Sequence, residues 1–177
     1  MTKRKNVDDV TSNIPGSDGQ SRKYGMSTLA VHAGARPDPV TGARGTPIYQ
    51  TTSFVFDDAE HGAELFNLQT FGYVYSRMTN PTVSVFEERV AQLEGGRGAV
   101  ATSSGHAAQF IAAATLMEAG DEFIASRNLY GGSVTQFGVS FPKLGWKCNF
   151  VDPTDPENFE KAMNDKVKFI FCEGVAN

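Results

Sequence analysis

The chain has 177 residues, which allows one ordinary domain, and 40% of them are hydrophobic, enough to build a core. A formal net charge of −4 at pH 7 gives no basic surface for nucleic acid. No apolar run reaches the roughly 18 residues typical of a membrane helix, and the basic start Met1–Lys5 is not followed by the apolar stretch of a secretory signal. Cys148 and Cys172 lie in apolar runs and are interpreted as buried thiols of a reducing cytosol. These features predict a cytoplasmic protein without a membrane or nucleic-acid partner.

The composition changes twice along the chain. Residues 1–24 are rich in Lys, Asp, Ser and Gly and poor in apolar residues, which is typical of a disordered leader. Residues 25–79 contain several Gly and Pro residues without a clear period, so we expect an extended N-terminal arm with one strand-like run from Ile48 to Phe56. An α/β pattern begins at residue 80 and continues to residue 177.

Helices and short apolar runs alternate in this last part. Asn80 suits a helix cap, Pro81 suits the first turn, and Gly95 suits the end of the same helix. Strands separated by helices are typical of right-handed βαβ units, so the sequence predicts an α/β fold with a parallel sheet. We expect strands at 98–103, 121–126, 146–151 and 167–172, and helices at 105–118, 132–141 and 155–163.

One loop suits a phosphate. Ser103–Ala108 joins the first expected strand to its helix, and the free N–H groups and positive dipole end of a helix favour an anion. Gly105 would let the backbone approach the ligand closely, whereas an ordinary Ser-capped helix is the alternative interpretation.

Two further segments could contact a ligand, one through an aromatic ring and one through a phosphate clamp. Tyr130 precedes two glycines and could lay its ring on a flat ligand, with a simple turn as the alternative. Tyr75 and Arg77 would face the same side of an extended segment and could clamp a phosphate, with a solvated strand edge as the alternative.

Together these segments closely resemble the motifs of the Cys/Met-metabolism family of pyridoxal-phosphate (PLP) enzymes. The family's Y-x-R-x-x-N-P-T corresponds to Tyr75–Thr82, and its S-G-x-x-A corresponds to Ser104–Ala108. Its L-Y-G-G-[ST] corresponds to Leu129–Ser133, and its E-S-x-x-N corresponds to Glu173–Asn177 with Gly174 in place of the usual Ser. Segments of the arm are similar to the O-acetylhomoserine sulfhydrylase subgroup at Leu29–Gly34, Thr41–Arg44 and Pro47–Asp58.

The resemblance implies the N-terminal arm and the incomplete large domain of a fold-type I PLP-dependent transferase. Its mostly parallel sheet would place the second expected strand between the third and the fourth, with the first strand at the opposite edge. The cofactor would be pyridoxal 5'-phosphate, with its phosphate held by the backbone of Gly105 and His106; the His106 imidazole is assigned no role. Tyr130 would stack on the pyridine ring and help proton transfer. Tyr75 and Arg77 would reach the neighbouring subunit of a homotetramer, and Asn177 would lie near the ring oxygen.

The implied reaction is a γ-replacement that makes homocysteine or methionine from O-acetylhomoserine and sulfide or a thiol. It needs a Schiff-base lysine, and no lysine of this sequence lies in the family's S-x-T-K context. We therefore expect the N-terminal fragment of the enzyme, inactive alone. A truncated inactive remnant, or a PLP- or phosphate-binding module, is the alternative. A nucleotide or phosphosugar binder is a weaker one, since G-x-G-x-x-G is absent.

Overall fold

A computed structural model describes residues 12–15 and 21–175 of the chain. It forms two compact units, the N-terminal unit Met1–Ala101 and the C-terminal unit Thr102–Asn177. The division falls after Ala101, whereas the composition changes at residue 80. The division into leader, arm and large domain stays a prediction for the whole protein.

The leader contains two short strands. β1 (Ser12–Pro15) and β2 (Ser21–Tyr24) pair antiparallel, with Ser12 opposite Tyr24. We expected no regular structure here, because the segment has few apolar side chains to bury. Strand pairing instead satisfies backbone N–H and C=O groups, which every non-proline residue carries. The remainder of the expected leader, residues 1–11 and 16–20, lies outside the described residues.

The arm is not extended throughout, because it contains two helices that the sequence interpretation missed. α1 (Met26–His32) buries Leu29 and contacts helix α3. After it, Gly34 has a φ of 72°, and a Cβ there would lie 2.8 Å from the carbonyl oxygen of Val85, so glycine allows this close packing. α2 (Ala59–Phe66) begins where the Asp58 carboxylate accepts the N–H of His61 at 2.8 Å.

The strand-like run from Ile48 to Phe56 forms only one isolated antiparallel bridge, between Ser53 and Tyr75. Helix α3 (Pro81–Glu94), in contrast, confirms the predicted boundaries. The Asn80 side chain accepts the N–H of Thr82 at 2.9 Å, and Gly95 ends the helix with a φ of 65°. Both ends are therefore fixed by local chemistry.

The predicted strand at 98–103 is wrong: residues 98–102 have no regular secondary structure. Val100 is 79% exposed. The N–H of Ala101 donates to the Glu87 carboxylate of α3 at 2.7 Å rather than to another strand. A strand requires a paired neighbour, and none of the described strands pairs with this segment.

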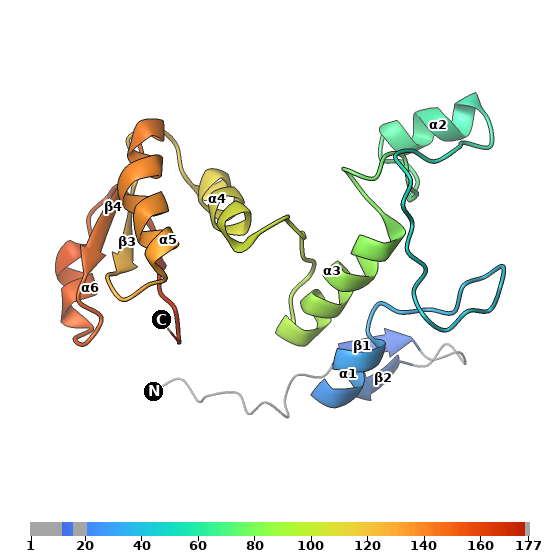
Figure 1. Ribbon diagram of the computed structural model, residues 1–177, viewed down its shortest axis with the longest axis horizontal. Helices are drawn as coiled ribbons and strands as arrows, with labels where there is room; N and C mark the ends of the chain where they lie inside the picture. The colour runs from blue at the N-terminus through green and yellow to red at the C-terminus, as the bar shows by residue number, and fades with distance from the viewer. Residues whose placement is uncertain (1–11, 16–20, 176–177) are drawn as a thin grey trace. The chain divides into compact units, whose positions relative to one another are not determined.

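The C-terminal unit confirms the other three predicted strands, of which β3 and β4 are labelled in Figure 1. β3 (Glu122–Ser126), β4 (Lys147–Val151) and β5 (Val167–Phe171) form a parallel sheet in the order β4-β3-β5. The second expected strand therefore lies between the third and the fourth, as the family resemblance implied. Ile124 and Ala125 of the central strand are fully buried.

Helices connect these strands. α4 (Gly105–Leu116) precedes β3, and α6 (Glu157–Ala162) connects β4 to β5. The helix expected at 132–141 begins as α5 (Gly131–Thr135) and continues through a π-helical turn, Gln136–Ser140, and a 3₁₀ turn, Phe141–Leu144. Within the part of the chain that the structure describes, no helix is both long and apolar enough to cross a membrane.

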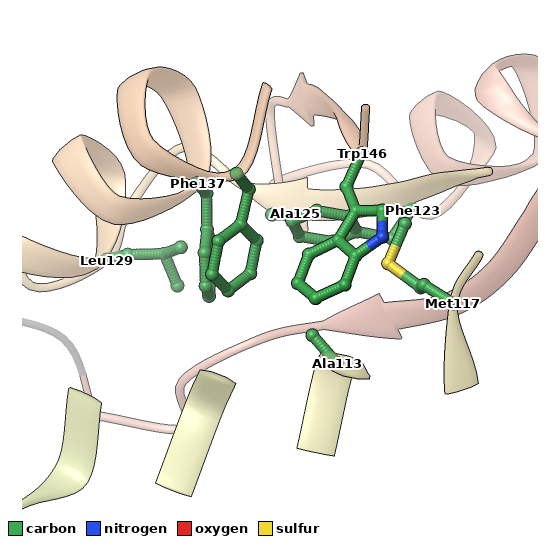
Figure 2. Close-up of a cluster of buried hydrophobic side chains, with 8 residues drawn as sticks. Ala113, Met117, Phe123, Ala125, Leu129, Phe137 and Trp146 are labelled. Carbon is green, nitrogen blue, oxygen red and sulfur yellow. The ribbon is translucent and has the colours of Figure 1, made fainter. Parts of the chain in front are cut away.

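An aromatic cluster forms the core of the C-terminal unit (Figure 2). Phe123 of β3 contacts Phe137 edge-on, with ring centroids 5.1 Å apart, and stacks on Phe169 at 4.8 Å. Figure 2 shows Ala113 of α4 directed toward the part of the cluster where the Phe137 and Trp146 side chains lie. Phe123 therefore joins the central strand to the helical layer and to β5. The buried members are Ala113, Met117, Phe123, Ala125, Leu129, Phe137, Phe141 and Trp146.

Glu122 connects the starts of the strands through its carboxylate. It accepts bonds from Asn149 at 2.7 Å, Asn164 at 3.2 Å and Lys147 at 3.2 Å. The hydrogen bonds from the side-chain amides of Asn149 and Asn164, with a smaller effect of Lys147, lower the pKa of Glu122 from 4.5 to about 2. Since the folded state holds this group ionised, its stabilising contribution is present above the ordinary pKa and is lost as pH falls toward 2.

We expect Glu122→Gln to weaken the acid dependence of stability. The free energy of unfolding, measured by urea denaturation from about pH 5 to about pH 2, should fall less steeply in this variant than in wild type. Glu160→Gln, at an exposed position of α6, is the matched control. Identical slopes for wild type and Glu122→Gln would contradict the assignment.

The two cysteines differ in environment. Cys148 in β4 is partly buried, and burial raises the pKa of its thiol to about 12. Cys172 is exposed, so the prediction of a buried thiol is wrong at this position. Side chains alternate along β5, and Cys172 continues the outward face of exposed Ile170.

Candidate cofactor site

The first turn of α4 presents free backbone donors. The Ser104 hydroxyl accepts the N–H of Ala107 at 3.1 Å. The N–H groups of Gly105 and His106 have no acceptor among the described residues. A Cβ placed on Gly105 would meet no atom within 4 Å, so the space beside it is open. This end of the helix can therefore bind an anion through its N–H groups.

Tyr130 follows β3 at the start of α5. Its backbone N–H donates to the Glu173 carboxylate at 3.1 Å, which ties the loop after β3 to the loop after β5. The residue is 49% exposed, and its phenol hydroxyl has no hydrogen-bond partner within residues 12–15 and 21–175. The ring and the hydroxyl are thus both available to a ligand.

These features share one pocket of about 240 Å³. Free N–H groups, an aromatic ring, a carboxylate and an amide converge there, beyond the carboxyl ends of β3 and β5, where ligands bind in open α/β sheets. The structure therefore brings together Gly105, His106 and Tyr130. The lining residues are Ser104, Gly105, His106, Gln109, Tyr130, Ser133 and Glu173.

Three lining residues were not singled out from the sequence for a side-chain role. Gln109 Nε2 donates to the hydroxyl of fully buried Ser133 at 2.9 Å, which joins α4 to α5. Gln109 lies four residues after Gly105, so helical spacing could have placed it on the same face. The contact of Glu173 with Tyr130 carries no local sequence signal, because it depends on the sheet order.

Tyr75 and Arg77 lie in the N-terminal unit and contact each other. The guanidinium carbon of Arg77 lies 5.4 Å from the centroid of the Tyr75 ring, a cation–π geometry. Asn177 lies outside the described residues. No group of three or more His, Cys, Asp or Glu side chains suited to a metal is found in the described part of the chain.

Asn80 and Thr82 hold the segment around Tyr75 and Arg77. The buried Asn80 amide donates to the carbonyl of Tyr49 at 2.9 Å and to the hydroxyl of Ser76 at 3.0 Å. Thr82 Oγ1 donates to the Pro47 carbonyl at 2.7 Å and accepts the N–H of Tyr49 at 2.9 Å. The arm and the start of α3 are therefore joined by side chains.

We expect Asn80→Ala to lower the free energy of unfolding by about 1–3 kcal/mol, because it leaves the Tyr49 carbonyl and the Thr82 N–H without this partner. Chemical denaturation followed by circular dichroism measures the loss. Asn67→Ala, at the exposed end of α2, is the control and should change little. Equal effects of the two substitutions would refute the structural role of Asn80.

The model of the Cys/Met metabolism PLP-dependent enzyme family matches residues 27–177. The chain belongs to this family. It is 49% identical over 163 residues to O-acetyl-L-homoserine sulfhydrylase of Leptospira meyeri, covering 92% of this chain and 37% of the relative. It is 47% identical over 152 residues to homocysteine synthase of Schizosaccharomyces pombe, covering 86% of this chain and 35% of the relative.

A solved structure described as an O-acetylhomoserine (thiol)-lyase of Campylobacter jejuni, carrying N'-pyridoxyl-lysine-5'-monophosphate, matches with a TM-score of 0.82. Sequence identity is 34%, covering 87% of this chain and 38% of that one. The predicted family and its fold are thereby confirmed. The chain spans little more than a third of the length of these relatives.

Proposed function

We propose that this chain is the N-terminal part of a PLP-dependent enzyme that makes homocysteine or methionine from O-acetylhomoserine and sulfide or a thiol. The observation that carries the proposal is the pocket that joins the free N–H groups of Gly105 and His106 to the ring of Tyr130. Backbone N–H groups that can bind an anion, placed beside an exposed aromatic ring, suit a flat aromatic phosphate ester. The names of the relatives support the substrates.

Each residue of the pocket has a proposed part. The N–H groups of Gly105 and His106 bind the phosphate. The hydrogen bond from Gln109 to Ser133 keeps α4 fixed relative to α5. Tyr130 stacks on the pyridine ring, and its phenol, which has no hydrogen-bond partner among the described residues, holds or moves a proton. When bound, the cofactor supplies an electron sink for loss of a substrate proton.

The remaining predicted residues belong to the same proposal. Tyr75 and Arg77 would bind the phosphate in a neighbouring subunit of a homotetramer, and the contact between them orients the guanidinium fork. Asn177 would lie near the ring oxygen. The whole enzyme would act in the cytoplasm.

We propose that the Schiff-base lysine lies in a segment outside these 177 residues. Among the described residues, no lysine lines the pocket. Three lysines instead form ion pairs with carboxylates. The Nζ atom of Lys147 lies 3.2 Å from Glu122, that of Lys161 lies 3.1 Å from Glu157, and that of Lys168 lies 3.4 Å from Asp121. These pairs hold the three ammonium groups beside carboxylates that do not line the pocket.

Activity assays test this function. A full-length enzyme containing this sequence should form homocysteine from O-acetylhomoserine and sulfide. The 177-residue chain with PLP should form no more than free PLP does. No product from the full-length enzyme would contradict the function. Product from the chain alone, well above free PLP, would contradict the assignment of the lysine to another segment.

A further inference from the structure

Two rings meet above Gly132 in the candidate site. The centroids of the His106 and Tyr130 rings lie 5.7 Å apart with an interplanar angle of 33°, within the range of favourable aromatic pairs. A Cβ placed on Gly132 would lie 2.5 Å from His106 Cε1 and 2.6 Å from Tyr130 Cε1. The two rings therefore fill the space that a side chain at position 132 would need.

The backbone beneath this pair is fixed by polar contacts. Gln136 Nε2 donates to the His106 carbonyl at 3.0 Å, and Gln109 Nε2 donates to the Ser133 hydroxyl at 2.9 Å. Both bonds join the first turns of α4 to the helix that begins at Gly131. The base of the His106 side chain is thus held beside Gly132.

The Tyr130 ring has no comparable anchor of its own. Its hydroxyl has no hydrogen-bond partner among the described residues, and the residue is 49% exposed. Among the described aromatic rings, only the His106 ring pairs with it. Among the contacts of the described residues, those with His106 and Gly132 restrict the ring.

We infer that His106 is a positioning residue: its imidazole, packed over Gly132, holds the Tyr130 phenol ring in place at the pocket. The side chain thereby has a role separate from that of the His106 backbone N–H. The inference rests on the proposed function only where it concerns PLP, since the contact between the rings exists without it. A ring held before binding loses less freedom when a flat ligand stacks on it, so affinity should depend on the imidazole.

The test compares His106→Ala with His106→Phe in the 177-residue chain. Both variants keep the backbone N–H, but only phenylalanine keeps a ring over Gly132. His61→Ala, in α2 of the N-terminal unit, is the control. Ring signals of isotope-labelled tyrosine are recorded by NMR, with Tyr130 assigned through Tyr130→Phe, and PLP dissociation constants are measured by equilibrium dialysis.

We expect His106→Ala to shift the Tyr130 ring signal and to weaken PLP binding about two- to tenfold, without lowering the melting temperature. His106→Phe should restore both. An unmoved Tyr130 signal in His106→Ala, tighter PLP binding, or no rescue by His106→Phe would overturn the inference. If the wild-type chain binds no PLP, the Tyr130 signal alone decides whether His106 positions the ring, and the assay of the full-length enzyme decides the proposed function.

Discussion

Phe123→Ala is expected to lower the free energy of unfolding of the C-terminal unit by about 3–5 kcal/mol. Phe123 is fully buried, lies in the central strand and contacts the rings of Phe137, Phe141 and Phe169. Alanine would leave a cavity between the sheet and the helical layer, and rings anchored on three different elements could not close it together. The loss is large compared with a typical domain stability of about 5–15 kcal/mol.

Fluorescence of Trp146, which lies in the same cluster, follows this unfolding directly. Phe66→Ala is the matched control, since that side chain is 64% exposed at the end of α2. We expect a change below about 1 kcal/mol there. A Phe123→Ala protein as stable as the control would show that the cluster is not the core of the unit.

Tyr130→Phe in a full-length enzyme is expected to reduce turnover by about 10²–10⁴-fold while changing PLP affinity much less. Phenylalanine keeps the ring that stacks on the cofactor and packs against His106. It removes the phenol hydroxyl, which has no structural hydrogen bond in the described part of the chain and is therefore free for proton transfer.

The comparison requires kcat and the PLP dissociation constant for each variant. Tyr24→Phe, at the end of β2 in the N-terminal unit, is the control. Turnover equal to wild type would remove Tyr130 from the catalytic residues. A loss of PLP affinity as large as the loss of turnover would assign the hydroxyl to binding instead.

Features determined by neighbouring residues could be predicted from the sequence. The ends of α3 follow from Asn80, Pro81 and Gly95, because capping depends on residues within one turn. The apolar runs predicted as strands at 121–126, 146–151 and 167–172 do form β3, β4 and β5, because each has a neighbouring strand within the described chain. The same reasoning failed at 98–103, where an apolar run has no strand beside it.

Contacts between distant residues could not be predicted in this way. α1 contacts α3, and Gly34 after it lies against Val85 of α3, but no local pattern in the sequence reports that packing. The sequence located Gly105, His106 and Tyr130 on two loops, but the convergence of two rings over Gly132 depends on how α4 and α5 are joined. The role of the His106 imidazole therefore follows from this geometry and not from the sequence.

The central claim is that the start of α4 and the ring of Tyr130 hold pyridoxal phosphate. NMR amide shifts of the isotope-labelled chain, recorded while PLP is added, test it most directly. We predict the largest shifts at Gly105, His106 and Tyr130, with inorganic phosphate moving only the first two. Saturation without shifts at these residues, or shifts centred on the separate pocket between Arg127 and Lys161, would contradict the account.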